Sequence, residues 1–300
     1  VNVLTLDNGG ATPGAIQIEQ GRHTLSAPVA LLGETDIKPV AGTALSVNAP
    51  VDGIGSLVKR NAGELILGAA NTFTGGLRLV SGTLTLTNGA NAGTGPLSLE
   101  NDYAPLRVAG TGPSELGGPL SVRVAQPVVE VAPQAGAVLA GGLAYEHAGA
   151  ATLIKRGAGE LVLAGVTEAA TDNARVSLEE GQVRFAAGSV SRIGDVDRQA
   201  FRMDTDNGRA RTLTVEAGAQ VTLAGLYMAS GTNAVVVDGQ LAFSGNNDAA
   251  CLRIQGNTVE DRVTVRAGGM LSCLPGAWFN IGVRGPGALS IEGGTAQLGS

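Results

Sequence analysis

The residue types that could do chemistry gather in one acidic segment, GDVDRQAFRMDTDNGRAR, at positions 194–211. Carboxylates that converge on one surface can act as general acid and base, or can bind Ca²⁺ through their oxygens. The run DTDNG follows the spacing at the start of a calcium loop, but Val215 stands where the closing glutamate of an EF-hand would lie. The aspartates of the segment are Asp195, Asp197, Asp204 and Asp206.

We interpret this segment as part of a surface loop inserted at 187–211, in which aspartates and arginines pair locally. A Ca²⁺ site at Asp204 and Asp206 is one alternative, a pair of catalytic carboxylates is the other, and no other cofactor is expected. Because exposed loops on a rigid scaffold often carry binding residues, the insertion is also the best place for a binding loop. Its candidate contacts are Asp195, Asp197, Arg202 and Arg209.

Trp278 is a further candidate for ligand contact, and it precedes Phe279 in the run PGAWFNIGV. An indole ring can stack on a sugar, but this aromatic pair can also fill a corner or cover a terminal coil. The two histidines, His23 and His147, have no matching Ser or Cys motif, so we expect them in turns or on the surface.

The two cysteines, Cys251 and Cys273, lack metal-site spacing and are too few for a disulfide framework. Cys273 takes the position that Leu223 and Phe243 hold in earlier repeats, so its side chain is expected to point inward. Two buried thiols are the expected state, and a disulfide between adjacent coils is the alternative.

The composition predicts a core of small aliphatic side chains. The 300 residues include 46 glycines, while only 3% are aromatic and 15% charged, and the net charge is −6. No basic cluster suits nucleic acid, and no apolar run is long enough for a membrane-spanning helix. The chain starts at Val1 without a signal segment, so we interpret it as a processed product or a piece of a longer chain.

An internal repeat organises the chain. LVKRNAGELIL at 57–67 and LIKRGAGELVL at 153–163 share eight of eleven residues at an offset of 96. A shorter period lies within this offset, because strand–glycine turn–strand units recur along the last third of the sequence. These units start at Leu213, Val235, Val263 and Leu289.

Each unit alternates apolar and polar residues over three to five positions, which is typical of a strand with one buried face. A unit this short cannot close its own core, but stacking successive units pairs each strand with its equivalent in the next coil. The chain is therefore predicted to be all-β, a single elongated parallel β-helix over 1–300 with about 12 coils of ~24 residues. The period blurs at 86–130, where prolines leave helical insertions open.

The alternation assigns a direction to the side chains of the first copy. Leu65 and Leu67 are expected to point inward, and Gly63 makes the corner before them. We expect the charged residues of the copy to lie outside on a solvated face: Lys59, Arg60 and Glu64. The next corner is expected to use short polar side chains that bond to free backbone groups, from Asn71, Thr72 and Thr74.

These residues resemble the autotransporter-associated β-strand repeat of passenger domains in bacterial type V secretion proteins. That repeat reads L-x-K-x-G-x-G-x-L-x-L, then N-T-Y-T-G-G-T and an aliphatic strand that ends G-x-L. The matching residues are Leu57, Lys59, Gly63, Leu65, Leu67, Asn71, Thr72, Phe73 (for Tyr), Thr74, Gly75, Gly76, Gly82 and Leu84. Asn61 and Leu77 replace the Gly and Thr of the family. The second copy keeps only the first half, with Leu153, Lys155, Gly157, Gly159, Leu161 and Leu163.

The resemblance implies a right-handed parallel β-helix that is exported through the outer membrane, with a structural or adhesive role. A passenger role would require a C-terminal translocator part beyond this sequence. We therefore expect a non-enzymatic extracellular protein at the bacterial cell surface, acting as an adhesin or a structural stalk. Its expected partners are a host or neighbouring-cell surface, a matrix or glycan ligand, and further copies of itself, but not nucleic acid or the membrane interior.

Two other functions are kept open. A carbohydrate-active β-helix of lyase or hydrolase type would need carboxylates that converge on one face, and only Asp195–Asp206 offers them. A subunit of a cell-surface filament or coat would use the solenoid ends or lateral faces as contacts.

Overall fold

The computed structural model describes residues 2–7, 9, 12–87, 89, 91–169, 174–194, 200–203, 208–245, 250–255, 261–273, 278–282 and 285–297. These residues form strands and turns. Within these ranges there is no helix that is long and apolar enough to cross a membrane. The chain divides into two compact units, Val1–His147 and Ala148–Ser300.

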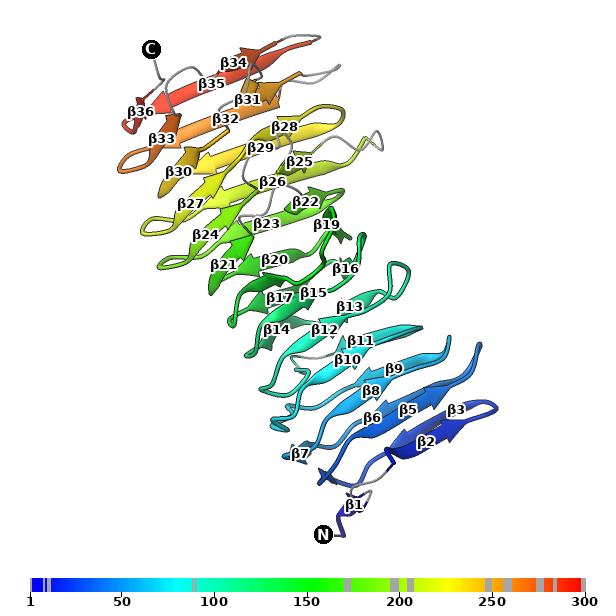
Figure 1. Ribbon diagram of the computed structural model, residues 1–300. Helices are drawn as coiled ribbons and strands as arrows, with labels where there is room; N and C mark the ends of the chain where they lie inside the picture. Colours follow the sequence, from blue (N-terminus) through cyan, green and yellow to red (C-terminus); the bar gives the residue numbers. More distant parts are fainter. Residues whose placement is uncertain are drawn as a thin grey trace. The chain divides into compact units, whose positions relative to one another are not determined.

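The first unit winds in coils whose strands line up on three faces, and Figure 1 shows successive coils side by side. The β2 face consists of β2 (Gly14–Ile18), β5 (Thr35–Pro39), β8 (Leu57–Lys59), β10 (Leu77–Leu79), β12 (Leu97–Leu99), β15 (Leu120–Val122) and β18 (Leu143–Tyr145). The β3 face consists of β3 (Arg22–Leu25), β6 (Ala44–Val47), β9 (Glu64–Leu67), β11 (Thr83–Thr87), β13 (Leu106–Ala109) and β16 (Val128–Val131). The third side carries β1 (Leu4–Leu6), β4 (Val29–Leu31) and β7 (Val51–Gly53), and later β14 (Gly112–Leu116) and β17 (Ala135–Leu139).

The second unit also has three parallel faces. The β19 face consists of β19 (Ala151–Arg156), β22 (Ala174–Leu178), β25 (Phe201–Met203), β28 (Leu226–Met228), β31 (Ala250–Ile254) and β34 (Trp278–Ile281). The β20 face consists of β20 (Glu160–Leu163), β23 (Gly181–Phe185), β26 (Ala210–Val215), β29 (Thr232–Val237), β32 (Asp261–Arg266) and β35 (Gly287–Glu292). The β21 face consists of β21 (Val166–Ala169), β24 (Val190–Ile193), β27 (Gln220–Leu223), β30 (Gln240–Phe243), β33 (Met270–Cys273) and β36 (Thr295–Gln297).

Parallel pairing stacks like residues into inward columns. Leu57 pairs with Leu77, Leu77 with Leu97, and Leu97 with Leu120, so leucine lies on leucine through four coils. Each of these side chains is almost completely buried. Because full burial of a leucine side chain is worth roughly 1.5–3 kcal/mol, these columns supply the main stabilisation of a core that few aromatic residues enter.

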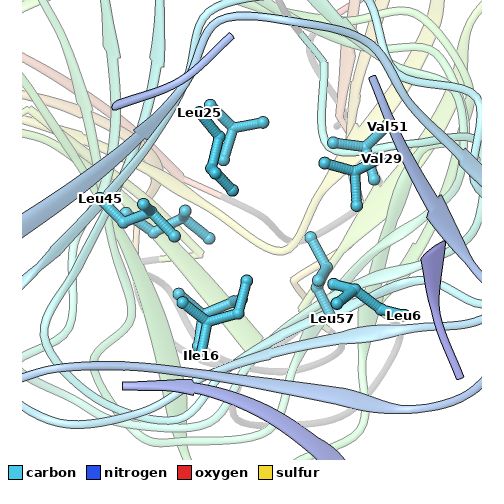
Figure 2. A pocket seen from close by; sticks show the side chains of 10 residues that line it. Leu6, Ile16, Leu25, Val29, Leu45, Val51 and Leu57 are labelled. Carbon is cyan, nitrogen blue, oxygen red and sulfur yellow. The ribbon is translucent and has the colours of Figure 1, made fainter. Parts of the chain in front are cut away.

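The core of the first unit is closely packed. Leucine, isoleucine and valine side chains from all three sides point toward one small space, which Figure 2 shows. The space has a volume of about 20 Å³, and its lining includes Ile16, Leu25, Val29 and Leu57. Because its lining is apolar, the space offers no hydrogen-bond partners to a water molecule.

The predicted fold class, an all-β parallel solenoid, is confirmed. Coil length varies, because Leu57 pairs with Leu77 after 20 residues and Val190 pairs with Gln220 after 30. The region at 86–130, for which the sequence leaves helical insertions open, contains strands from β11 to β16. The expected insertion at 187–211 contains β24 and β25, both paired in register with neighbouring coils.

Glycine is required where one corner lies directly on another. Gly82 has a φ of 74°, and a Cβ added there would lie 2.3 Å from the carbonyl oxygens of both Asn61 and Gly63. Gly42 has a similar φ of 80°, but a Cβ at that position would meet no atom within 4 Å. The two glycines therefore share a left-handed backbone conformation and differ in how crowded the space around them is.

This pair gives a matched test of corner stacking. Gly42→Ala should lower the free energy of unfolding by about 1 kcal/mol, because a residue with a Cβ is disfavoured in the left-handed conformation. Gly82→Ala should lower it by about 3 kcal/mol or more, since the neighbouring corner at Asn61 and Gly63 must also move away from the new Cβ. Chemical denaturation of both variants measures the difference, and equal costs would contradict the stacking.

Candidate functional site

The prediction that Lys59 lies on the solvated face is wrong, because its side chain is 0% exposed. Lys59 ends β8 and occupies an inward column, where it pairs with Ile37 on one side and Leu79 on the other. Arg60 and Glu64 do lie on the outer side, where both form ion pairs. The strand sequence Leu57–Val58–Lys59 places lysine on the same side as leucine.

The buried ammonium group serves as a hydrogen-bond donor inside a corner. Its Nζ donates to the carbonyl oxygens of Arg60 at 2.9 Å, Asn61 at 2.8 Å and Ser81 at 2.8 Å. Two of these oxygens belong to its own corner and the third to the corner of the next coil. One side chain thereby joins two successive corners from within.

The second copy of the repeat has the same arrangement. Lys155 is the next-to-last residue of β19, is 0% exposed, and donates from Nζ to the carbonyl oxygens of Gly157 at 2.5 Å and Glu180 at 2.9 Å. The left-handed residue of the corner is Gly157 here and Asn61 in the first copy, with φ values of 78° and 61°. Asparagine tolerates this conformation better than other residues with side chains, so both sequences make the same corner.

Burial sets the proton affinity of both lysines. Removal from water lowers the pKa of Lys59 to about 8, although Glu64 opposes the shift. Burial likewise lowers the pKa of Lys155 to about 8, against the attraction of Glu180 and Glu160. A buried amine with a lowered pKa can serve as a nucleophile or base in other proteins. Here both amines donate to carbonyl oxygens of corners, which indicates a structural role.

Further buried polar groups continue the stack in the second unit. Arg211 is 1% exposed and donates to the carbonyl oxygens of Glu179 at 2.9 Å and Ser230 at 2.7 Å. It also donates to Oδ1 of Asn233 at 3.0 Å, and Asn233 donates from Nδ2 to Asp261 at 2.9 Å. Arg211 pairs in register with Gly181 and Asn233, so this chain runs along one corner from coil to coil.

The NTFTGG corner of the first unit uses asparagine in place of lysine. Asn71 is buried, accepts a hydrogen bond from the backbone N–H of Val51 at 3.0 Å, and donates to the carbonyl oxygen of Asn91 at 2.6 Å. Asn91 in turn accepts from the backbone N–H of Asn71 at 2.8 Å. The predicted backbone bonding is confirmed for Asn71, whereas Thr72 and Thr74 are exposed.

The outer surface of the first unit carries ion pairs that run from coil to coil. Arg78 donates two hydrogen bonds of 2.9 Å to Glu100, and Arg123 contacts Glu100 at 3.4 Å and Glu146 at 2.8 Å. The hydrogen bonds from Arg78 lower the pKa of Glu100. On the β3 face, Arg107 lies 3.9 Å from Glu64 and 3.3 Å from Glu130.

The second unit repeats this pattern on the β20 face. Arg184 donates to both carboxylate oxygens of Glu160, at 2.8 and 2.9 Å, and to Glu216 at 2.7 Å. A hydrogen bond from the backbone N–H of Ala187, together with Arg184, lowers the pKa of Glu216. Such carboxylates stay ionised at neutral pH and are poor general acids.

Two shallow hollows lie at corners of the second unit. One, of about 290 Å³, is lined by Ala158, Glu180, Gly181, Gln182, Arg209, Ala210 and Thr212. The other, of about 240 Å³, is lined by glycine and alanine together with Gln220, Asp238 and Gln240. The first brings a carboxylate, a guanidinium, an amide and a hydroxyl together on one concave surface.

The binding-loop candidates are placed unequally. Arg209 lies in the first hollow, where it forms an ion pair with Glu180 and its side chain is 53% exposed. Arg202 lies on β25 and pairs in register with Tyr227. Trp278 begins β34, but its side chain lies outside the described residues. The aspartates Asp195, Asp197, Asp204 and Asp206 also lie outside the described residues, so the calcium and carboxylate hypotheses stay predictions.

The histidines agree with their expected surroundings, whereas of the two thiols expected to be buried only Cys251 is, since Cys273 is half-buried. His23 is exposed and His147 half-buried, and each bonds to a backbone carbonyl of a turn or strand end. Cys273 pairs with Phe243, which pairs with Leu223, as the repeat alignment predicted. Within the described ranges, no group of three His, Cys, Asp or Glu side chains has metal-site geometry.

Sequence reasoning missed the buried corner cations, although a signal was present. Lys59 follows Leu57 by two positions, Lys155 follows Leu153 by two, and Arg211 precedes Leu213 by two. Since strand side chains alternate with a period of two, each cation shares the inward side of a core leucine. A charged residue is normally expected on the outside of a strand, and that expectation hides the periodicity.

Comparison with known families supports the repeat. Residues 57–80 match the family model described as the passenger-associated-transport-repeat. The match covers one coil, from the start of β8 past the end of β10. Comparison with curated proteins and with solved structures finds no match.

The predicted resemblance to an autotransporter passenger with β-strand repeats is confirmed by this match and by the parallel solenoid. The repeat family implies secretion to the cell surface.

Removal of the corner cation should be costly. Lys59→Met keeps the length of the side chain but leaves three carbonyl oxygens without their donor, so we expect a loss of about 2–4 kcal/mol in the free energy of unfolding. Lys38→Met is the matched control, because it removes an outward lysine that pairs with Asp36 at 2.8 Å. A partly exposed pair of this kind is worth about 1 kcal/mol or less. Equal losses in urea denaturation would contradict the corner role.

The lowered pKa of Lys59 predicts a pH dependence with a defined sign. Between the folded value of about 8 and the ordinary value of 10.5, the unfolded chain binds more protons than the folded chain. The free energy of unfolding of the wild type should therefore rise with pH across this window and gain nothing from Lys59 below it. Lys59→Met should lack only the share of that rise that Lys59 supplies, because Lys155 has the same lowered pKa, so its deficit against the wild type should grow between pH 7 and pH 10.5. A deficit that shrinks with pH would reverse the sign and contradict the shift.

Proposed function

We propose that this chain is a non-enzymatic passenger β-helix that stands on the bacterial cell surface, outside the outer membrane, as a stalk with an adhesive exterior. The observation that carries the proposal is the passenger repeat at 57–80, which coincides with one coil of the solenoid. Coils on both sides continue its register, from Thr35 through Leu57 and Leu77 to Leu97. A repeated coil supports length and rigidity better than it supports an enclosed reaction site.

The charges of the described exterior support a non-catalytic role. A general acid needs a carboxyl group whose pKa is raised toward neutrality. Hydrogen bonds and arginine neighbours instead lower the pKa of Glu100 and Glu216. Burial alone would raise the pKa of Asp36, but hydrogen bonds from Lys38 and Arg60 lower it. These carboxylates act as fixed charges of the surface ladders.

The adhesive contact is assigned to the hollow around Arg209. Its lining offers the donors and acceptors that hydroxylated polymers such as glycans use, and it is open to solvent. The rigid corners below hold these groups in place, because Lys155 bonds to the carbonyl of Glu180 and Arg211 to that of Glu179. A shallow, preorganised polar surface suits weak multivalent contact with a cell surface or matrix.

Surface exposure of the full-length gene product tests the main proposal. Intact cells treated with a protease should lose an epitope inserted at Gly42, a turn position where an added Cβ meets no atom within 4 Å. A periplasmic control protein should stay intact in the same cells. Loss of the epitope only after the cells are broken would overturn the surface location.

Glycan and matrix binding by immobilised protein tests the contact site. Arg209→Ala combined with Gln182→Ala should weaken binding about tenfold. The double variant removes two polar contacts worth roughly 1 kcal/mol each, and water replaces part of them. Arg22→Ala is the control, because Arg22 is an exposed arginine in a surface ion pair of the first unit. Equal binding by all variants would exclude the hollow. Release of reducing ends from a polysaccharide would favour the enzymatic alternative, and growth of particle size with concentration would favour a filament subunit.

A further inference from the structure

A β-bulge in the second unit gives one cysteine an unusual position. Strand β31 pairs with β34 so that Ala250 faces Trp278 and Leu252 faces Phe279, which leaves Cys251 as an extra residue. Regular alternation would turn Cys251 outward between its neighbours, yet it is 2% exposed. Bulges of this kind redirect a side chain, and here the redirected group is a thiol.

The redirected thiol meets the other cysteine of the chain. Cys273 ends β33 on a different face, in the inward column below Leu223 and Phe243. Cys251 donates from Sγ to the carbonyl oxygen of Gly245 at 3.1 Å, and Gly245 follows by two positions Phe243, the register partner of Cys273. Burial raises the pKa of the Cys251 thiol, and the nearby Cys273 side chain opposes that rise. Both cysteines are thiols in the structure. Two thiols from different faces thus lie near one another.

We propose that Cys251 and Cys273 form a redox-controlled latch, in which a disulfide joins the bulge of β31 to the end of β33. The pair is distinct from the adhesive hollow, and the inference does not depend on the proposed function. The oxidant is a small-molecule disulfide such as oxidised glutathione. It accepts the two electrons that the cysteines lose, and the two thiol protons leave with the reduced products.

The environments of the two thiols set the order of the exchange. Cys273 is partly exposed, so its thiolate attacks the small disulfide, forms a mixed disulfide and releases one small thiol. Cys251 is enclosed, and burial raises the pKa of its thiol. The sulfur of Cys251 then attacks the Cys273 sulfur of the mixed disulfide, which forms the protein disulfide and releases the second small thiol.

The latch would close a loop that contains a complete strand of the core. The 21 residues between the two cysteines include β32, whose inward valines Val263 and Val265 are fully buried. Beyond this loop the core is less covered, because the residues of β35 are half-buried or exposed. A covalent link here limits the unfolding of the last coils, since closing a loop removes freedom mainly from the unfolded chain.

The test compares the purified chain before and after equilibration with oxidised glutathione. We expect the intact mass to fall by two hydrogen atoms, both cysteines to resist alkylation after unfolding, and one crosslinked peptide to contain Cys251 and Cys273. The thermal midpoint of the second unit should rise by roughly 5 °C or more, and a reducing agent should reverse the change.

Single variants provide the controls. Cys251→Ser and Cys273→Ser should each keep the reduced midpoint and gain no stability from oxidant, and Cys251→Ser should stop at a glutathione adduct on Cys273. Three results on the wild type alone would overturn the latch: a stable glutathione adduct without the internal disulfide, a disulfide only between chains, or an internal disulfide that lowers the midpoint.

Discussion

The constraint on which this structure depends is that each coil must turn inside a core only a few side chains wide. At several described corners the chain leaves its ladder, and the carbonyl groups released on the inner side need donors in a place with little water. Lys59, Lys155 and Arg211 supply those donors from within, and Asn71 does so at another corner. The aliphatic columns can then stack in register, because the corners above and below are tied together.

The same arrangement explains why the exterior is available for function. Because the strands alternate, residues that do not enter the core form outward columns, and arginine–glutamate ladders fill several of them. These ladders hold surface side chains in place, and their arginines help to lower the pKa values of Glu100 and Glu216. The described coils therefore present their charged side chains on the outer faces of the solenoid.

The ion pairs between successive coils can be located in the sequence only after the structure gives the length of each coil. Arg78 meets Glu100 after 22 residues, whereas Arg184 meets Glu216 after 32. Coils of unequal length cannot be aligned by a constant period, so no ion pair could be assigned from the sequence. The contact between Cys251 and Cys273 depends in addition on a bulge, which a short run of residues does not specify.

The sequence by itself determined the coil. Alternating aliphatic residues, glycine or asparagine at left-handed positions and the repeat at 57–67 and 153–163 are local features, and local features decide strands and corners. The tertiary structure decided what lies between the coils. The spacing of two from Leu57 permits an inward Lys59, but the stacked coils make its burial stable. Carbonyl oxygens from two successive corners converge on the ammonium group, and that convergence exists only after the coils have stacked.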